Sequence, residues 1–264
     1  MSKPTYTLVT GASNGIGRAF AEECAERGDN VLLVALPEPK LEEVTNQLSS
    51  QYPEQSFHLL GINLMDQGAP QQILKWCNDN GFTVNLLINN AGLGNSGPFV
   101  SRPAEFYQGQ MQLNMVSLVG LTHLFLPMMM AQEKANIINV ASMAAFYDIP
   151  FKGIYSASKK FVLSFSRSLN KELEGSSVKI TVLCPASVPT NPDVMQREKE
   201  LGLMARLSSR TPKQVASYTL DKMLQGKQVV IPGFFPRLYK RIGTVVPYRT
   251  RLNILAKQFV KNSK

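Results

Sequence analysis

Short apolar runs rich in Val, Ile and Leu recur along the chain, and between them apolar residues follow the period of a helix. The runs predict strands at Tyr6–Thr10, Val31–Ala35, Ser56–Gly61, Val84–Asn89, Ala135–Val140, Val178–Leu183 and Gln228–Pro232. The periodic stretches predict helices near Ile16–Arg27, Pro39–Gln51, Ala69–Asn80, Ala104–Ala131, Gly153–Glu174 and Thr211–Gln225. Near-continuous apolar strands that alternate with helices are typical of parallel strands buried on both faces. With right-handed crossovers, the pattern predicts a doubly wound α/β fold with about seven parallel strands.

Glycine-rich or polar segments stand directly after three of the predicted strands. The first strand leads into Thr10–Gly17, which reads Thr-Gly-Ala-Ser-Asn-Gly-Ile-Gly. The fourth ends in Asn89-Asn90-Ala91-Gly92, and Ser142 follows the fifth. Ligands of such sheets bind at the carboxyl ends of the strands, so these segments are predicted to share one site.

The first of these segments has the context of a dinucleotide-binding turn. Its glycines, Gly11, Gly15 and Gly17, lie between a predicted strand and a predicted helix. In that setting glycines let the backbone approach a pyrophosphate at the start of the helix. A single glycine-rich turn is also consistent with a tight connection and nothing more, but the strand and helix around it favour binding.

A tyrosine and a lysine, Tyr155 and Lys159, are spaced four residues apart in a predicted helix and so lie on one face of it. A free tyrosine has a pKa of about 10, and a neighbouring ammonium is expected to lower it. Such a pair can exchange a proton with a carbonyl or an alcohol. Each residue alone has an ordinary interpretation: a surface pair for these two, a loop serine for Ser142 and a polar helix residue for Asn114. Their joint occurrence after the expected strands favours an active site.

Together these residues resemble the short-chain dehydrogenase/reductase family over about Thr5 to Pro232. The matching pieces are Thr10-Gly11-x-x-x-Gly15-x-Gly17, Asn89-Asn90-Ala91-Gly92, Asn114, Ser142 and Tyr155-x-x-x-Lys159. The resemblance implies a Rossmann fold, a nicotinamide cofactor, and hydride transfer between a carbonyl and an alcohol. The rival interpretation, from another class, is a non-catalytic nucleotide-binding or interaction protein that kept the fold.

The resemblance assigns a role to each matching catalytic residue. Tyr155 is expected to be the general acid or base, and Lys159 to lower its pKa and hold the nicotinamide ribose. Ser142 is expected to bind the substrate oxygen, and Asn114 to hold a water that links Lys159 to solvent. Phe146 and Tyr147, which follow Ser142, are expected either to line the substrate pocket or only to pack.

The resemblance also implies a set of cofactor-binding residues. Besides Tyr155 and Lys159, they are Gly11, Ser13, Asn14, Gly15, Ile16, Gly17, Asn63, Leu64, Asn90, Ala91, Gly92, Pro185, Val188 and Thr190. Two positions depart from the family pattern: Ala186 replaces a usual glycine, and Asn63 stands where an aspartate is common. An amide oxygen can still accept the hydrogen bond expected of that aspartate.

The end of the second predicted strand bears on the choice between NAD and NADP. An acidic residue there binds the ribose 2′-hydroxyl, and a nearby arginine accommodates a 2′-phosphate. The two decisive positions hold Ala35 and Leu36, so neither determinant is present. Without the acid a 2′-phosphate is not repelled, and Ser13 can donate to it, which favours NADPH.

Composition narrows the class of protein. With 264 residues, of which 44% are hydrophobic, the chain can build a sizeable core. Its three cysteines have neither disulfide nor zinc spacing, and both histidines are expected to be structural, so no metal site is predicted. No signal segment and no membrane-spanning run are expected, which predicts a cytoplasmic protein.

Positive charge is concentrated in the last part of the chain. Residues 227–264 contain nine Lys and Arg and no acidic residue, while the rest of the chain is neutral. We therefore predict a catalytic domain over residues 1–233 and a basic extension over residues 234–264. Helical spacing of Leu238, Ile242 and Val245, and again of Tyr248, Leu252 and Leu255, predicts two basic amphipathic helices. They can lie on an anionic membrane, bind an acidic carrier protein, close over the active site or pack against a second subunit, whereas no recognition motif suggests nucleic acid.

The sequence thus predicts an NAD(P)-dependent oxidoreductase acting on a fairly apolar ketone or aldehyde, or on the matching secondary alcohol. The alternative is a 3-oxoacyl-type reductase with a carrier-bound or membrane-associated substrate. Residues 188–210 are expected to cover the substrate with an apolar inner face. By analogy with the family, a homo-oligomer, either a dimer or a tetramer, is expected.

Overall fold

Seven parallel strands form one sheet in a computed structural model that describes residues 4–188 and 209–260. Their bounds are β1 (Thr5–Thr10), β2 (Asn30–Ala35), β3 (Phe57–Gly61), β4 (Thr83–Asn89), β5 (Ala135–Val140), β6 (Val178–Leu183) and β7 (Val229–Val230). The strand order is β3-β2-β1-β4-β5-β6-β7, and every neighbouring pair is parallel. The predicted doubly wound α/β fold is confirmed.

The order of the strands reverses beside β1. The chain adds β2 and β3 on one side of β1 and then returns to place β4 on the other side. At such a switch point the connections leave β1 and β4 in opposite directions, so a crevice opens at their carboxyl ends. The glycine-rich turn after β1 and the Asn89–Gly92 segment at the end of β4 meet there.

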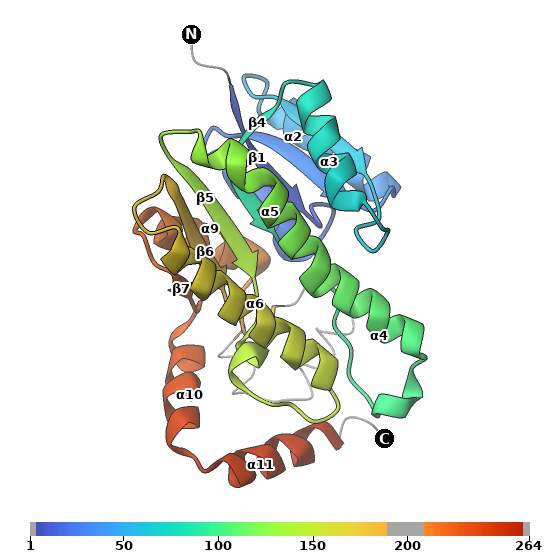
Figure 1. The fold of residues 1–264 in the computed structure, drawn as a ribbon, viewed down its shortest axis with the longest axis vertical. Coiled ribbons are helices and arrows are strands. Elements are labelled where there is room, and N and C mark those ends of the chain that lie inside the picture. Colours follow the sequence, from blue (N-terminus) through green and yellow to red (C-terminus); the bar gives the residue numbers. More distant parts are fainter. Residues whose placement is uncertain (1–3, 189–208, 261–264) are drawn as a thin grey trace.

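Helices cover both faces of the sheet (Figure 1). On one face lie α1 (Gly15–Glu26), α2 (Pro39–Gln51) and α9 (Pro212–Leu224), which share an apolar cluster with the strands. On the other face lie α3 (Ala69–Asp79), α5 (Ser117–Met130) and α6 (Gly153–Glu172). Along β2, Val31 and Leu33 point to the first cluster, and Leu32 and Val34 point to the second. This alternation explains why the strand sequences are almost entirely apolar.

The helix predicted over residues 104–131 is not continuous. It consists of α4 (Ala104–Met111), a π-helical stretch at Gln112–Val116 and α5. A π-helical turn inside an α-helix often marks a functional site, and this one carries Asn114. One short 3-10 turn, Phe99–Ser101, precedes α4.

The stretch Ala104–Met130 is long and apolar enough to span a membrane by length and composition, which the sequence prediction did not anticipate. Its apolar side chains have another explanation in the fold. Leu121, Phe125 and Met129 are buried against the sheet, and 39% of the apolar window is buried in all, as expected of a helix that packs one face on a sheet.

Two helices follow the last strand, namely α10 (Phe234–Val245) and α11 (Tyr248–Val260). A short 3-10 helix after β5, η3 (Met143–Phe146), lies beside α10. The division of the chain at residue 233 stays a prediction. Of the segment predicted to cover the substrate, residues 189–208 lie outside the described part.

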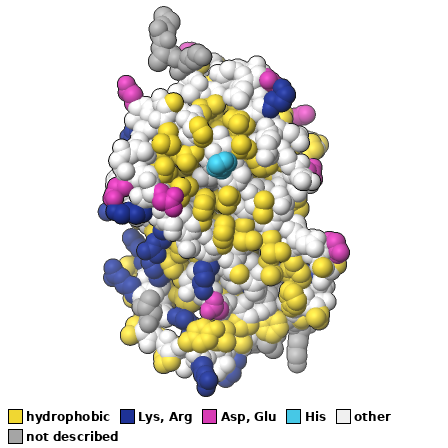
Figure 2. Space-filling model, in the orientation of Figure 1, with side chains coloured by type: hydrophobic (Ala, Val, Ile, Leu, Met, Phe, Trp, Pro, Cys, Tyr) yellow, Lys and Arg dark blue, Asp and Glu magenta, His cyan; other side chains and the backbone are white. Residues whose placement is uncertain are grey.

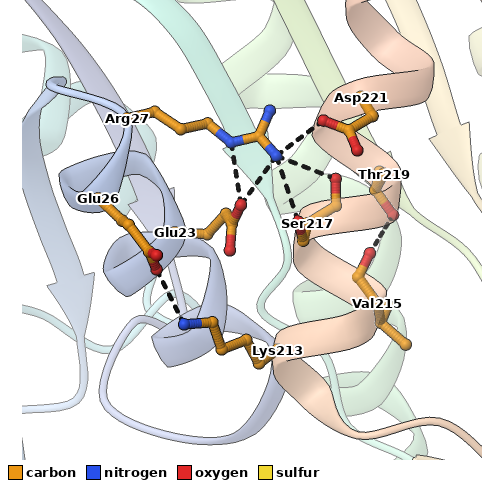
Figure 3. Close-up of polar contacts among 8 residues, drawn as sticks. All are labelled: Glu23, Glu26, Arg27, Lys213, Val215, Ser217, Thr219 and Asp221. Carbon is orange, nitrogen blue, oxygen red and sulfur yellow. Dashed lines mark hydrogen bonds and ion pairs between the residues drawn. The ribbon is translucent and has the colours of Figure 1, made fainter.

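Ion pairs fix α9 to α1 (Figure 3). The Arg27 guanidinium contacts the carboxylates of Glu23 and Asp221, each at 2.8 Å, and Lys213 contacts Glu26 at 2.9 Å. Glu23 is buried, so its charge depends on this partner. The helix that follows the undescribed segment is therefore fixed to the helix that begins at the glycine-rich turn.

Candidate active site

The glycine-rich turn is shaped so that side chains cannot enter it. Gly11 and Gly15 have φ values of +67° and +56°, in the left-handed region. A Cβ on Gly17 would lie 2.1 Å from the Gly11 carbonyl oxygen. Asn14 caps α1 by accepting a hydrogen bond from the Gly15 N–H at 2.8 Å. The start of α1 is thus brought close to the end of β1, which is the place where a pyrophosphate binds in such folds.

The side chain of Thr10, the first residue of the glycine-rich motif, joins β1 to β4. Its Oγ1 accepts hydrogen bonds from the N–H groups of Asn90 (2.9 Å) and Ala91 (3.1 Å) and donates to the Ile88 carbonyl (3.2 Å). In return the Asn90 amide donates to the Thr10 carbonyl at 2.9 Å. Asn90 therefore holds the two strand ends together. Thr10 and Asn90 both belong to motifs quoted from the sequence, but the hydrogen bonds between them were not predicted.

Ser142, Tyr155, Lys159 and Asn114 come together at the carboxyl edge of the sheet. Ser142 follows β5, Tyr155 and Lys159 project from α6, and Asn114 lies on the π-helical stretch. The Lys159 Nζ and the Asn114 Oδ1 would each lie 3.3 Å from a Cβ built on Gly92. The Tyr155 ring would lie 3.4 Å from a Cβ built on Gly94. The loop after β4 thus passes directly over the side chains of Tyr155, Lys159 and Asn114.

Asn114 clamps that loop. Its Oδ1 accepts from the Leu93 N–H at 2.8 Å, and its Nδ2 donates to the Leu93 carbonyl at 2.9 Å and to the Ser158 hydroxyl at 3.1 Å. Both amide hydrogens are therefore used within the protein. In this structure the side chain positions the loop, and only a lone pair of Oδ1 remains for the water predicted from the resemblance.

A second amide, Gln110, contacts the same loop and was missed by the sequence prediction. It is fully buried, and its Nε2 donates to the Leu93 carbonyl at 2.9 Å and to the Asn95 side chain at 3.0 Å. Its Oε1 is buried and has no hydrogen-bond partner among the described residues. Gln110 precedes Asn114 by one turn, so the two amides act on one loop. Their helical spacing was the available signal.

Burial, and not the lysine, dominates the acidity of Tyr155. Removal from water raises the pKa of the Tyr155 hydroxyl, and a hydrogen bond with Ser142 opposes the rise. The net shift is thus opposite to the lowering predicted from Lys159, whose own contribution stays a prediction. The physical reason is that a buried phenolate loses its hydration, while the Lys159 Nζ lies 5.9 Å from the centre of the ring.

Keeping the Lys159 ammonium buried and charged lowers the stability of the fold. Burial lowers the pKa of its ammonium from 10.5 to about 8. Its Nζ donates to the Val140 carbonyl at 2.8 Å, which fixes the end of the side chain between β5 and α6. The lysine remains mostly protonated at neutral pH, and it places a positive charge beside Gly92 and Asn114.

The other predicted cofactor residues lie around the same edge. Asn63 accepts from the Met65 N–H and donates to Asp66, and the Leu64 carbonyl accepts from the Ser117 hydroxyl. The Pro185 carbonyl accepts from the Met143 N–H at 2.9 Å.

The remaining residues predicted to bind or select the cofactor differ in how far they are exposed. Val188 is buried, and Thr190 lies outside the described residues. Ser13 and Ile16 are half-buried in the turn. At the end of β2, Ala35 is buried and Leu36 is exposed.

Several other side chains have structural roles. The His58 ring contacts Phe82, with ring centres 4.6 Å apart, and burial lowers its pKa. Within residues 4–188 and 209–260, no three His, Cys, Asp or Glu side chains form a cluster that could hold a metal. Phe146 and Tyr147 both contact α10, through Lys240 and Tyr239, which favours the packing interpretation of these two rings.

The residues therefore fit a nicotinamide dinucleotide. The glycines of the turn pack against the Gly11 carbonyl, Asn90 and Ala91 with no space for a Cβ, which is the close packing that dinucleotide-binding turns require, and Lys159 and Tyr155 lie against the loop that follows β4. Ser142 and Tyr155 place two hydroxyl groups beside each other, as a carbonyl oxygen requires.

Comparison with known proteins gives the same family throughout. The sequence model of the family described as short chain dehydrogenase matches residues 5–201. A very-long-chain 3-oxoacyl-CoA reductase of Anas platyrhynchos is 28% identical over 259 residues, which cover 96% of this chain and 79% of that protein. A very-long-chain 3-oxoacyl-CoA reductase-B of Danio rerio is 33% identical over 190 residues, or 70% of this chain and 60% of that protein. The chain thus spans less than two thirds of the Danio relative.

Two solved structures with a similar fold contain a nicotinamide cofactor. A short-chain dehydrogenase from Sphingobium yanoikuyae in complex with NADPH is 27% identical, with a TM-score of 0.77 over 91% of this chain and 93% of that one. A short chain dehydrogenase/reductase from Burkholderia phymatum in complex with NAD is 25% identical, with a TM-score of 0.76 over 86% and 88%. Relatives of this fold therefore bind either nicotinamide cofactor.

Proposed function

The chain belongs to the short-chain dehydrogenase family of oxidoreductases, and from this premise we propose that it reduces a fairly apolar ketone or aldehyde with NADPH. The observation that carries the proposal is the convergence of Ser142, Tyr155 and Lys159 beside the glycine-rich turn. A nucleotide-binding protein without catalysis needs the turn but does not need a buried tyrosine and a buried lysine.

The proposed chemistry follows from the hydroxyl groups. A nicotinamide held by these residues would supply a hydride to the carbonyl carbon. The Tyr155 hydroxyl gives its proton to the carbonyl oxygen, and the Ser142 hydroxyl donates a hydrogen bond to the same oxygen. The product is an alcohol, and the phenolate left behind is stabilised by the charge of Lys159. Because burial raises the pKa of Tyr155, the phenol keeps its proton at neutral pH, which suits an acid for carbonyl reduction.

The test is Tyr155→Phe, which removes the proton and keeps the ring. We expect kcat with a reducible ketone to fall by about 10²–10⁴-fold, while NADPH binding, followed by its fluorescence, stays within about twofold because the ring still fills its place. Tyr52→Phe, at the end of α2, is the matched control and should keep wild-type turnover. Wild-type rates in Tyr155→Phe would refute the assignment.

NADPH is proposed over NADH because the end of β2 carries no acidic side chain. The Gly11 N–H donates to the Val34 carbonyl at 2.7 Å, so the turn with Ser13 lies against that strand end. Leu36, exposed beside it, offers a direct test. Leu36→Arg should tighten NADPH binding about tenfold through a charge-assisted hydrogen bond to the 2′-phosphate and leave NADH binding unchanged. An equal effect on both cofactors would argue against a 2′-phosphate at this position.

A second candidate substrate is a long-chain 3-oxoacyl thioester. The names of the Anas and Danio relatives support it. The two candidates are separated by measuring kcat/KM for 3-oxoacyl-CoA esters of increasing chain length beside simple ketones of the same length. A steep rise with chain length for the thioesters alone would favour the second candidate. Absence of NADPH oxidation with every carbonyl would instead favour a non-catalytic protein.

We also propose that the protein is a cytoplasmic homo-oligomer that pairs through α5 and α6. Val116 and Phe161 are exposed beside this pair of helices, and the Phe161 and Phe165 rings are stacked, with centres 5.9 Å apart. Apolar side chains of this size on one surface favour a second subunit. Phe161→Glu should lower the mass measured by light scattering to that of a single chain, and an unchanged mass would refute this interface.

A further inference from the structure

Helix α10 presents its large apolar side chains to solvent. Phe234 is 64% exposed, Leu238 36%, Ile242 49% and Val245 82%. These residues are spaced three or four apart, so they form one stripe along the helix. In a helix that only covers a core, such a stripe faces inward. Here it faces outward, and Tyr248 continues the exposed apolar surface at the start of α11.

The orientation of α10 is fixed by contacts on its other side. A Cβ on Gly243 would lie 2.8 Å from the Tyr147 ring, so the helix approaches that ring as closely as a glycine permits. The Tyr147 hydroxyl donates to the Tyr239 carbonyl at 2.9 Å, and the Lys240 ammonium lies 4.6 Å from the centre of the Phe146 ring. Pro236 is buried. Rotation of the helix to bury its apolar stripe would break all these contacts.

Basic residues share the exposed stripe. Arg237 and Arg241 are exposed, and with Phe234 and Leu238 they line one hollow on the surface. In Figure 2 hydrophobic side chains gather with Lys and Arg at the lower end of the molecule, where Figure 1 places α10 and α11. Phe99 and Val100, in the turn before α4, are also among the most exposed apolar residues.

We propose that α10 and the start of α11 bind the surface of an anionic lipid membrane. The hollow is lined by Phe234, Leu238 and the side chains of Arg237 and Arg241, which suits the first part of an acyl chain with the arginine charges near its phosphate. Basic amphipathic helices bind such surfaces through apolar burial and electrostatic attraction together. The complete absence of acidic residues from residues 227–264 supplies the charge complementarity.

A second copy of the chain is a poorer occupant of the same surface. Symmetric pairing through α10 would bring the arginines of both copies together, and no acidic residue between 227 and 264 could offset them. The membrane proposal does not depend on the proposed reaction, because it rests on contacts of α10 alone.

The charge part of the proposal is tested by sedimentation of the full chain with vesicles. Wild-type protein should pellet with vesicles that are about one third phosphatidylglycerol and remain in solution with pure phosphatidylcholine. Each basic residue near an anionic surface contributes about a fivefold factor in binding, so Arg237→Gln with Arg241→Gln should weaken it about 25-fold. The control removes two exposed charges elsewhere, Lys40→Gln with Lys179→Gln, and should bind at least several times more strongly than the α10 variant.

The apolar part is tested by one matched pair. Ile242→Glu and Leu224→Glu make the same change at residues of similar exposure, on α10 and α9 respectively. Only Ile242→Glu should lose vesicle binding, by about tenfold or more, while both variants keep the wild-type rate of carbonyl reduction in solution. Absence of wild-type pelleting, or equal pelleting of the two variants, would overturn the proposal. A loss of oligomer mass on Ile242→Glu without vesicle binding would assign the surface to a second copy instead.

Discussion

Replacement of the buried Lys159 by methionine should stabilise the protein at neutral pH while removing its activity. Burial lowers the pKa of the ammonium from 10.5 to about 8. At about 1.4 kcal/mol per pKa unit, keeping the charge inside the folded chain costs about 3 kcal/mol at pH 7. Methionine has a similar shape and no charge, but it leaves the Val140 carbonyl without the donor it has in the wild type. That loss costs about 1 kcal/mol, so the variant should be about 2 kcal/mol more stable.

The sign of this difference depends on pH. Because the folded-state pKa is lowered, the unfolded chain binds the proton more tightly between about pH 8 and pH 10.5. The free energy of unfolding of the wild type therefore rises with pH across this window, and that of Lys159→Met lacks the rise. At about pH 9.5 the cost of the charge falls to about 1.5 kcal/mol, and the two proteins should then be nearly equal in stability.

The assay is urea denaturation of both proteins at about pH 7 and about pH 9.5, with turnover measured in parallel. Lys160→Met is the matched control: Lys160 is the next residue, is half exposed and pairs with Asp148. It should change the free energy of unfolding by less than about 0.5 kcal/mol and show no such pH trend. The reasoning would be refuted if Lys159→Met were less stable than the wild type at pH 7. It would also be refuted if the two proteins differed by the same free energy of unfolding at both pH values.

Three further changes test the turn, the ion pairs and the loop. Gly17→Ala should weaken NADPH binding by about tenfold or more and lower the free energy of unfolding by about 1–3 kcal/mol, because its Cβ would lie 2.1 Å from a carbonyl oxygen. The control is Gly153→Ala, which has open space around it and should change neither quantity. Cofactor titration and thermal melting measure the two effects. Arg27→Leu should cost about 2 kcal/mol in urea denaturation, since it strands a buried carboxylate, whereas Lys75→Leu in an exposed pair should cost about 0.5 kcal/mol or less. Gln110→Leu should lower kcat several-fold with an unchanged NADPH dissociation constant, because it loosens the loop over the tyrosine; a change in cofactor binding of equal size would contradict a role confined to the loop.

Most of the strands were predictable because their sequences have one dominant signal. The bounds of β5 (Ala135–Val140) and β6 (Val178–Leu183) agree with the prediction, and each strand begins directly after a polar residue, Lys134 or Ser177. At β7 the prediction was too long: Gln228–Pro232 became Val229–Val230. This strand pairs with β6 only, and the N–H that Pro232 lacks could not extend the ladder.

The site was predictable in its members and less so in their environment. Spacing along α6 brings Tyr155 and Lys159 to one face, but it contains no information on how deeply that face is buried. Burial reverses the expected direction of the tyrosine pKa. The π-helical stretch at Gln112–Val116 was invisible for a similar reason, because its residues continue an apolar helical pattern and the wider turn appears only in the hydrogen bonds.

The departures from simple sequence rules concentrate at one edge of the sheet. A buried ammonium at Lys159 and a buried Gln110 amide oxygen that has no partner among the described residues both lie at the carboxyl ends of β4 and β5. Each lowers stability, and none is needed to build the sheet, whose core residues obey the expected alternation. Structural necessity therefore does not explain them. They are explained by a site that must hold a charge and a proton donor away from water. That function requires polar groups where the fold alone would place apolar ones.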